Sequence, residues 1–491
     1  MTWNEQYEPV IGLEVHCQLL TKSKAFCSCS TKFGNEPNSN VCPVCLGMPG
    51  VLPVLNKQVV EFTIKMGLAT HCSVSPQSIL ARKNYFYPDL PKGYQISQYE
   101  EPICTKGFVE IEFEDGKKKT IGITRIHLEE DAGKSIHDLD VDTLVDVNRC
   151  GVPLIEIVSE PELRSPHEAY LYLYKIRQIV TYLGICDGNM EEGSVRCDAN
   201  VSVRKKGETK FGTKTEVKNM NSFRFVEKAI EYEINRQIEL LEESQRVEQT
   251  AMTAAISASW DARQGITVAM RTKEEAHDYR YFPEPDLVPV TVNNEWIESV
   301  RKQLPELPNE RRDRFVNVYK IPKYDANILT SEKPLADSFD SVISELTTKN
   351  ETTYKLASNW LIVNSLTAVN AGLISLPKLP DFSFAVSGIV NSIVEGKISS
   401  NQAKEVFEEA IETMQRPEVI IAKKGLLQIT DVSQIERVVQ NVLSINKEQV
   451  EKYRAGKSQV FGFFVGEVMK AMKGKGNPKL INEILKKKLE A

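Results

Sequence analysis

The chain of 491 residues is long enough for several domains, because one domain usually holds roughly 100 to 200 residues. Its composition, 41% hydrophobic and 26% charged, excludes a fibrous or wholly disordered protein. The 61 basic and 67 acidic side chains give a net charge of −6, so we expect any contact with nucleic acid to be local.

The sequence holds no apolar run of about 18 residues, the length that would predict a membrane-spanning helix. Its first residues, Met1 to Glu5, lack the basic and apolar regions of a secretory signal. We therefore expect a cytoplasmic protein with no membrane partner.

An alternation of polar and apolar residues predicts an antiparallel sheet in the N-terminal part of the chain. A capping box at Ser165 and a glycine at position 184 bracket a predicted helix, and a second helix is predicted for 222–248. The predicted strands are 11–19, 108–113, 120–128, 152–158, 194–204 and 213–219.

The polar faces of these strands carry carboxylates together with histidine or arginine. The first strand places Glu14 and His16 on one face, and the fifth places Arg196, Asp198 and Asn200 together. Such carboxylates suit Mg²⁺, and a magnesium nucleotide would explain the basic residues, so the pattern favours phosphoryl transfer. The alternative for any single strand is a solvated sheet face. Further acidic residues of this kind are Glu129, Glu130 and Glu156.

Four of the ten cysteines are grouped as Cys27-Ser-Cys29 and Cys42-Pro-Val-Cys45, with turn-forming residues between the pairs. This spacing is typical of two knuckles that close a tetrahedral thiolate site, and it predicts a structural Zn²⁺. Because four cysteine ligands leave no open position, we do not expect this zinc to take part in catalysis. The alternative is four reduced thiols on adjacent loops.

Beyond residue 293 the apolar residues recur at helical intervals, for example in 400–414, which predicts an all-helical C-terminal part. Residues 470–491 hold seven lysines and two glutamates and are a candidate RNA-facing segment, although solvated helix faces can be equally basic. The predicted divisions are an N-terminal domain 1–293 with a zinc knuckle at 27–45, a helical linker 294–342, a helical domain 343–410 and a helical tail 411–491.

Several longer motifs are distinctive. They are Gly12-Leu-Glu-Val-His16, Arg82-Lys-Asn-Tyr-Phe-Tyr-Pro-Asp89, His127-Leu-Glu-Glu-Asp-Ala-Gly-Lys134, Met190-Glu-Glu-Gly-Ser194 and Asp278-Tyr-Arg-Tyr-Phe-Pro-Glu-Pro285, with Tyr453-Arg-Ala-Gly-Lys457 and Gly462-Phe-Phe-Val-Gly466 near the C-terminus. These motifs resemble the GatB family, the B subunits of the aspartyl/glutamyl-tRNA(Asn/Gln) amidotransferases. The resemblance runs through essentially the whole chain.

The resemblance implies an α+β fold. Its N-terminal catalytic domain would be a cradle around an antiparallel sheet, similar to glutamine synthetase and the guanido kinases, and all-α YqeY-like domains would follow. The helical tail would then hold the tRNA. Since some family members lack the cysteine knuckles, zinc would stabilise this chain without being required for the reaction.

The implied activity is that of a ligase within the heterotrimer GatCAB. The B subunit would use ATP and Mg²⁺ to phosphorylate the side-chain carboxylate of Glu-tRNA(Gln) or Asp-tRNA(Asn). Ammonia from the amidase, GatA, would then replace the phosphate and give Gln-tRNA(Gln) or Asn-tRNA(Asn). A small third protein, GatC, would complete the heterotrimer.

Roles carried over from the resemblance fall on residues in the matching motifs and strands. The implied Mg²⁺ ligands are Glu14, His16, Glu130, Glu156 and Asp198. The implied catalytic residues are Lys83, Glu130, Arg149 and Arg196, and the implied cofactor contacts are Lys92, Glu129, Glu191 and Asn200. Each basic residue could instead be a structural ion-pair partner.

Two rival hypotheses come from other classes of protein. A noncatalytic RNA-binding scaffold would use the knuckle and the basic tail, but a pure phosphate binder should avoid clustered carboxylates. A stand-alone carboxylate–amine ligase acting on a small molecule would need only the cradle, and it would leave the basic helical tail without a purpose.

Overall fold

The computed structural model describes residues 6–136, 140–246, 256–272, 279–429, 431–472 and 475–490. The chain forms two compact units, Met1–Leu307 and Pro308–Ala491. Among the described residues, we find no helix with both the length and the hydrophobicity of a membrane-spanning segment.

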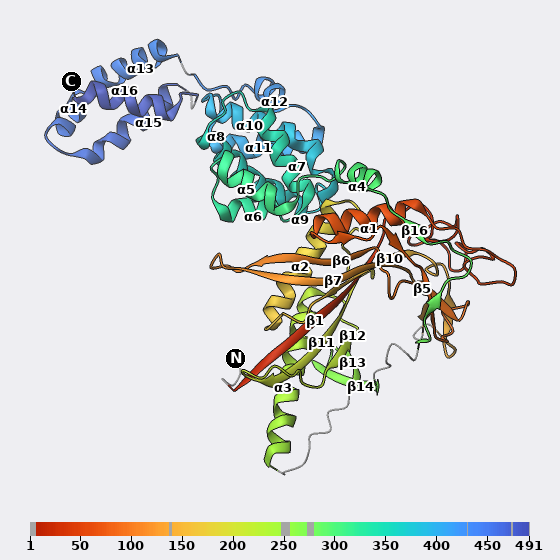
Figure 1. Ribbon diagram of the computed structural model, residues 1–491. Coiled ribbons are helices and arrows are strands. Elements are labelled where there is room, and N and C mark those ends of the chain that lie inside the picture. The colour runs from red at the N-terminus through yellow and green to blue at the C-terminus, as the bar shows by residue number, and fades with distance from the viewer. Residues whose placement is uncertain are drawn as a thin grey trace. The chain divides into compact units, whose positions relative to one another are not determined.

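A sheet of nine strands forms the centre of the first unit (Figure 1), in the order β14-β13-β12-β11-β1-β10-β7-β6-β2. Neighbouring strands are antiparallel except for β12 and β13. The strands are β1 (Tyr7–Gln18), β2 (Ser73–Val74), β6 (Cys104–Glu112), β7 (Lys118–Glu130), β10 (Pro153–Ser159), β11 (Val195–Lys205), β12 (Thr215–Lys218), β13 (Ile256–Asp261) and β14 (Ile266–Thr272). This mostly antiparallel sheet agrees with the predicted α+β class.

Three smaller sheets accompany the large one, in the orders β15-β4-β5, β16-β3 and β8-β9. Their strands are β3 (Gln77–Ser78), β4 (Ala81–Asn84), β5 (Tyr94–Ser97), β8 (Lys134–Ile136), β9 (Leu144–Asp146), β15 (Phe282–Pro283) and β16 (Val290–Thr291). The helices of the first unit are α1 (Lys57–Ala69), α2 (Pro166–Tyr182), α3 (Phe223–Arg246) and α4 (Asn294–Arg301).

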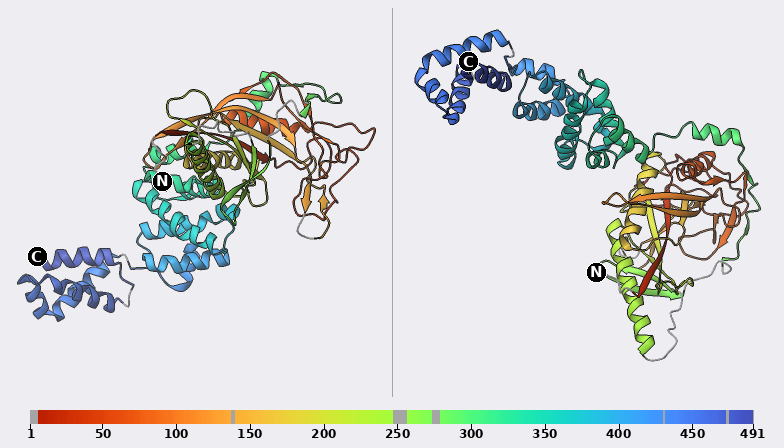
Figure 2. Two further views of the ribbon diagram at one scale, coloured as in Figure 1. Left: turned by 90° about the horizontal axis from the view of Figure 1, so that it is seen from below. Right: turned by 60° about the vertical axis from the view of Figure 1, so that its left-hand side comes forward.

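Helices cover one face of the large sheet, and α2 and α3 can be seen there in Figures 1 and 2. The period of two along β1 puts Leu13 and Val15 into this core, where both are fully buried. Burying each such side chain stabilises the fold by about 1.5–3 kcal/mol. Glu14 and His16 consequently lie on the opposite face, where they are only partly buried.

The helix expected after Ser165 is α2, and its start has the predicted cap. The Ser165 hydroxyl accepts a hydrogen bond from the Glu168 amide at 3.1 Å, and Pro166 opens the helix. Tyr172, Leu173 and Ile176 along α2 are completely buried. The helix therefore anchors the apolar face of the sheet and leaves the polar face to the site.

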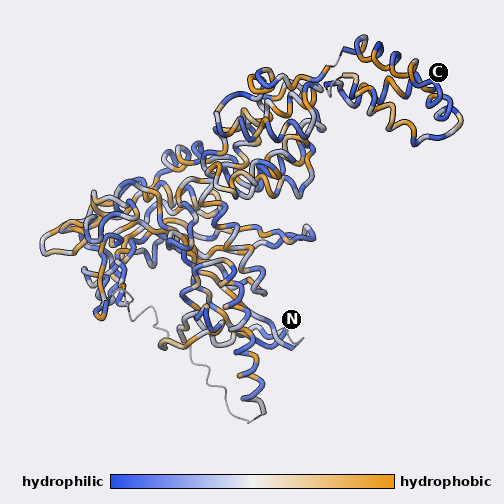
Figure 3. Tube along the Cα trace, turned by 180° about the vertical axis from the view of Figure 1, so that it is seen from behind, coloured by the Kyte–Doolittle hydropathy of each residue, from blue (hydrophilic) through white to orange (hydrophobic). Residues whose placement is uncertain are grey.

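The second unit is built from helices in the part that the structure describes. Figure 3 shows hydrophobic and hydrophilic residues alternating along them, as helical packing requires. They are α5 (Pro308–Val318), α6 (Lys323–Leu329), α7 (Lys333–Glu345), α8 (Glu351–Asn359), α9 (Leu366–Asn370), α10 (Ser383–Val394), α11 (Ser400–Thr413), α12 (Pro417–Lys424), α13 (Val432–Ile445), α14 (Lys447–Arg454), α15 (Phe461–Ala471) and α16 (Pro478–Glu490).

The last helices, α13 to α16, share a separate small core that includes Val439, Phe464 and Ile481, all fully buried.

The helix that opens the predicted linker, α4, packs within the first unit. Its Trp296 indole donates a hydrogen bond to Glu61 of α1 at 3.2 Å. The divisions at 342 and 410 stay predictions.

Candidate functional site

The polar face of the sheet brings four titratable side chains into one row. On β11, β1, β10 and β7, Arg196 pairs with His16, His16 with Glu156, and Glu156 with His127. Side chains opposite each other on antiparallel strands lie about 4.5–5.5 Å apart at Cβ. Register alone therefore builds a charged cluster across strands that are far apart in the sequence.

We call His16, Glu129 and Glu156 the first cluster; one ligand atom from each lies within 4.8 Å of the others. His16 Nε2 lies 3.5 Å from an oxygen of each carboxylate. His127 Nε2 lies 3.2 Å from Glu156 and 3.7 Å from Glu129. Two carboxylates and two imidazoles thus converge in a mostly buried space.

The first cluster holds its negative charge firmly. Burial disfavours the charged forms of Glu129 and Glu156, but the histidines outweigh it and lower the pKa of both carboxyl groups. Burial likewise opposes protonation of His16, yet Glu156, Glu129 and Asp198 raise its pKa to about 9. A cation, either a proton or a metal ion, is therefore strongly favoured at this position.

We call Glu14, Asp198 and Glu216 the second cluster; their oxygens also come within 4.8 Å of one another. Lys218 pairs with Asp198 and lies 3.6 Å from Glu216. Burial opposes the charge on this ammonium group, but Asp198 and Glu216 outweigh it and raise the Lys218 pKa. A cleft beside this cluster is lined by residues that include Glu14, Asn200, Phe211 and Lys214.

Asn200 and Ser257 hold two acids of the second cluster in place. The Asn200 amide donates to Glu14 at 2.8 Å, and the Ser257 hydroxyl donates to Glu216 at 3.0 Å. The arrangement offers oxygen ligands, a cation and an aromatic ring, which are the groups that a magnesium nucleotide requires.

Arg196 links the polar face of the sheet to a further acid outside the two clusters, the buried Asp131. Its Nη2 lies 2.9 Å from Asp131 Oδ2, which also accepts a hydrogen bond from Gln18 at 2.8 Å. The Arg196 Nε is buried and has no hydrogen-bond partner among the described residues. Arg149 lies 3.5 Å from the same carboxylate and donates to the carbonyls of Ala132 and Gly133.

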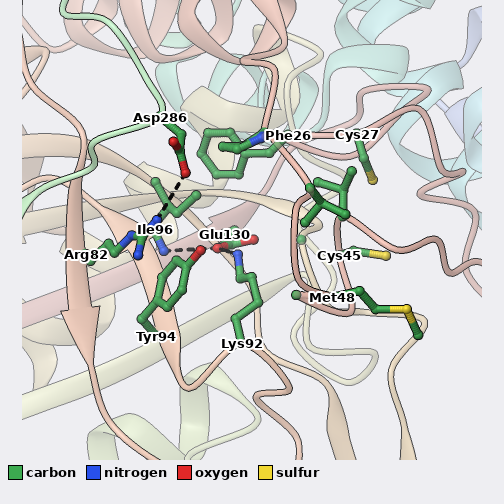
Figure 4. Close-up of a pocket in the computed structure, with 15 residues that line it drawn as sticks. Phe26, Cys27, Cys45, Met48, Arg82, Lys92, Tyr94, Ile96, Glu130 and Asp286 are labelled. Atoms are coloured by element: carbon green, nitrogen blue, oxygen red, sulfur yellow. Dashed lines mark hydrogen bonds and ion pairs between the residues drawn. The ribbon is translucent and has the colours of Figure 1, made fainter.

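Glu130 and Lys92 lie apart from both clusters. Because residues alternate along β7, Glu130 points to the face opposite Glu129, where it is buried and pairs with Lys92. The Ile96 amide also donates to this carboxylate at 3.0 Å. Figure 4 shows the pair in a pocket with Arg82, which lies 3.3 Å from Asp286.

Lys83 and Glu191 do not join either cluster. The Lys83 ammonium lies over the Tyr279 ring at 4.7 Å, and Glu191 is exposed on the turn before β11. Of the motif at 278–285, Asp278 lies outside the described residues. Burial, followed by Glu129 and Glu156, raises the pKa of Tyr281, so its hydroxyl group feels the charge of the first cluster.

The four grouped cysteines meet as the spacing predicts, with one sulfur from each within 4.8 Å of the others. The Cys42 amide donates to Cys45 Sγ at 3.2 Å, as backbone amides do to metal-bound thiolates. Four clustered thiol groups with such a donor fit a tetrahedral Zn²⁺. The site forms one wall of the pocket around Glu130 (Figure 4).

Sequence reasoning did not assign His127, Glu216 or Lys218 to the site. His127 lies two residues before Glu129 on the same strand, so the period of two was sufficient to place it. Glu216 and Lys218 share one face of a strand of only four residues, Thr215–Lys218, whose alternation is too short to be distinctive.

Comparison with known proteins gives matches over both parts of the chain. The family description "GatB/GatE catalytic domain" matches residues 9–298, and "GatB domain" matches 341–489. A relative from Thermodesulfovibrio yellowstonii is 55% identical over 485 residues, 99% of this chain and 100% of its own length. One from Chlorobium phaeobacteroides is 56% identical over 484 residues, 99% of each chain. Both are named as the B subunit of aspartyl/glutamyl-tRNA(Asn/Gln) amidotransferase.

Proposed function

The chain belongs to the GatB family, the B subunits of the aspartyl/glutamyl-tRNA(Asn/Gln) amidotransferases, and on that premise we propose that it activates the side-chain carboxylate of a mischarged tRNA. The γ-phosphoryl group of ATP passes to a carboxylate oxygen of Glu-tRNA(Gln) or Asp-tRNA(Asn), which gives an acyl phosphate and ADP. Ammonia attacks the acyl carbon and phosphate leaves, so the product carries an amide.

The observation that carries this proposal is the pair of acidic clusters on one sheet face. Phosphoryl transfer needs charge stabilisation around the reacting oxygens more than covalent help. Mg²⁺ bound at these clusters would neutralise phosphate charge and orient the phosphoryl group. We assign His16, Glu129 and Glu156 to one Mg²⁺ and Glu14, Asp198 and Glu216 to a second.

The basic residues near the clusters are assigned to binding the negatively charged groups of the substrates. Lys218 pairs with Asp198 of the second cluster, and its ammonium group would hold ATP phosphate oxygens there. Arg196, between His16 and Asp131, would face the carboxylate of the aminoacyl group with the exposed part of its guanidinium group. Arg149 and Asn200 position Asp131 and Glu14 through the contacts described above.

Glu130, Lys92 and Lys83 are assigned to the route by which ammonia reaches the acyl phosphate. Glu130 and Lys92 form a buried polar pair behind β7, and the residue next to Glu130, Glu129, belongs to the first cluster. Glu191, being exposed, is left without a role in phosphoryl transfer.

The remaining parts of the proposal concern fold, location and partners. The large sheet with a polar face is consistent with a cradle of the glutamine synthetase and guanido kinase kind. The four cysteines are assigned to a structural Zn²⁺. In this proposal a cytoplasmic GatCAB complex supplies the amidase GatA and the small protein GatC, and the helical tail binds tRNA.

The test is ADP formation by the assembled complex with Mg²⁺ and either Glu-tRNA(Gln) or uncharged tRNA. We expect ADP formation only with the charged tRNA, and we expect Asp198→Ala to abolish it while tRNA binding persists. Binding of tRNA without ATP turnover in the unmodified complex would favour a noncatalytic scaffold instead.

The tail has a separate test. Because α13 to α16 have their own core, residues 430–491, which make up most of the tail, can be removed, and the first unit should stay folded. We expect the truncated complex to retain ADP formation at saturating tRNA and to bind tRNA more weakly. Unchanged tRNA affinity at several salt concentrations would contradict the assignment of the tail.

A further inference from the structure

Lys24 lies inside the first unit, and no carboxylate among the described residues forms an ion pair with it. The side chain is fully buried, with an exposed fraction of 0%. Its ammonium group donates to the Asn40 carbonyl at 2.7 Å and to Cys45 Sγ at 3.6 Å. In the described part of the chain, these are the polar contacts of this ammonium group.

A buried lysine of this kind is unusual because removing an ammonium group from water costs several kcal/mol unless an anion compensates. One backbone carbonyl supplies only a partial charge. A nearby buried carboxylate, Glu130, already pairs with Lys92. The other contact of Lys24, Cys45, belongs to the four-cysteine group, so we look to the sulfur atoms for the compensating anion.

We propose that Lys24 is the counter-ion of a zinc site with four thiolate ligands. This inference rests on the assignment of Zn²⁺ to Cys27, Cys29, Cys42 and Cys45. One Zn²⁺ with four thiolates carries a formal charge of −2, which is costly in a partly buried loop. The ammonium group of Lys24 reduces that charge to −1 and stabilises the metal-bound state.

The surroundings of Lys24 hold its ammonium group against the sulfur. The Asn40 amide donates to the Asn148 side chain at 2.7 Å, which fixes the carbonyl that Lys24 contacts. A Cβ atom at Gly151 would come within 3.4 Å of Lys24 Cδ and 3.7 Å of Cys45 Cβ. Lys24 and Cys45 therefore pack against the same backbone position, and the lysine is fully buried there.

The experiment compares metal affinity in the full chain. Cobalt(II) is used first, because a four-thiolate cobalt site has a characteristic visible absorption spectrum, and zinc affinity follows from competition with a chelator. We expect the four-thiolate spectrum in the unmodified chain. Lys24→Met, which keeps most of the length of the side chain and removes its charge, should weaken the binding of both metals by about 10- to 100-fold. Lys22→Met, in the same loop but exposed, is the matched control.

A double-mutant cycle separates charge from packing. Cys29→His replaces one thiolate by a neutral imidazole and lowers the charge of the zinc site from −2 to −1. If Lys24 acts as a counter-ion, Lys24→Met should then weaken zinc binding by a smaller factor than it does with four cysteines. Circular dichroism of each metal-loaded variant checks folding.

The possible outcomes distinguish the counter-ion role of Lys24 from the assignment of the zinc site. Equal zinc affinity of Lys24→Met and the unmodified chain, or an equal fold-loss in both backgrounds, would overturn the counter-ion role. Absence of the four-thiolate spectrum in the unmodified chain would overturn the zinc site itself. Neither result depends on ATP turnover, so the proposed function is tested independently.

Discussion

His16 on β1 and Glu156 on β10 face each other in register, with 3.5 Å between the imidazole Nε2 and the carboxylate. His127 approaches the same carboxylate at 3.2 Å from β7. Glu156, like Glu129, therefore contacts both histidines, and it makes the shorter contact with His127. A buried carboxylate in this position orients the imidazoles and contributes a full negative charge to the first cluster.

Glu156→Gln should abolish ATP-dependent activation while the fold persists. The amide has nearly the same shape as the carboxylate, but it carries no charge to attract Mg²⁺. We expect a loss of roughly 10²-fold or more in ADP formation. The measurement is the rate of ADP formation with charged tRNA over a range of Mg²⁺ concentrations.

The control for this variant is Glu110→Gln on β6, because that side chain pairs with Lys118 at the surface. It should behave as the unmodified chain does. If the Glu156→Gln variant regains the rate of the unmodified chain at high Mg²⁺, the substitution has only weakened metal binding. A normal rate at low Mg²⁺ would remove Glu156 from the first cluster.

Lys218→Met should reduce kcat/KM for ATP by about 10- to 100-fold. Lys218 is the cation nearest the second cluster, where it pairs with Asp198. In our proposal this ammonium group contacts ATP phosphate, and no methionine atom can replace that charge. The measurement is ADP formation against ATP concentration at saturating Mg²⁺ and charged tRNA.

Lys218→Arg is the informative partner of that variant, since it keeps the charge. It should recover part of the activity that Lys218→Met loses. If both substitutions leave KM for ATP and kcat unchanged, Lys218 has no contact with the nucleotide.

The longer strands that carry the site, such as β1 and β11, were predictable because each has a clear period of two. The predicted strand 194–204 became β11, Val195–Lys205, and the capped helix after Ser165 became α2. What alternation could not give is the order of strands across the sheet. That order, with β1 between β10 and β11, decides that His16 lies between Glu156 and Arg196.

Glu130 shows where reasoning from the sequence loses information. Glu129 and Glu130 are adjacent acids at the end of one strand, and composition alone treats them alike. Their side chains point to opposite faces, so Glu129 joins the first cluster and Glu130 pairs with Lys92. The grouping of the four cysteines, in contrast, depends on short loops and followed directly from spacing.

Gly47→Ala should destabilise the first unit by about 1–3 kcal/mol. Gly47 has φ +67°, a left-handed conformation that disfavours a side chain. A Cβ atom there would also lie 2.9 Å from Lys92 Cα, so the added methyl group would push the cysteine loop away from Lys92. Chemical unfolding of the metal-loaded chain measures the loss.

Gly34→Ala separates strain from contact, because Gly34 has φ +80° and a Cβ atom there would meet nothing within 4 Å. It should show the backbone cost alone. A free energy of unfolding for Gly47→Ala equal to that of Gly34→Ala would show that the cysteine loop does not need its contact with Lys92.

Asp340→Asn should destabilise the second unit at neutral pH. Asp340 on α7 accepts hydrogen bonds from Arg311 at 2.6 Å and Arg314 at 2.8 Å, both on α5. Arg311 is buried, so losing the carboxylate leaves its charge undercompensated. Because Asp340 is partly exposed, we expect a moderate loss of about 1–3 kcal/mol.

The same ion pairs predict how this loss depends on pH. Burial disfavours the charged form of Asp340, but Arg314 and Arg311 outweigh it and lower its pKa below the ordinary value. The contribution of Asp340 to stability is therefore complete above the ordinary aspartate pKa of about 4. It is lost as pH falls through the lower pKa of Asp340 in the folded protein. Thermal unfolding of residues 308–491, with and without Asp340→Asn, is followed at a series of pH values. The stabilities of the two forms should differ most at neutral pH and converge in acid. A difference that stays constant down to about pH 2 would mean that the carboxylate charge contributes nothing to stability.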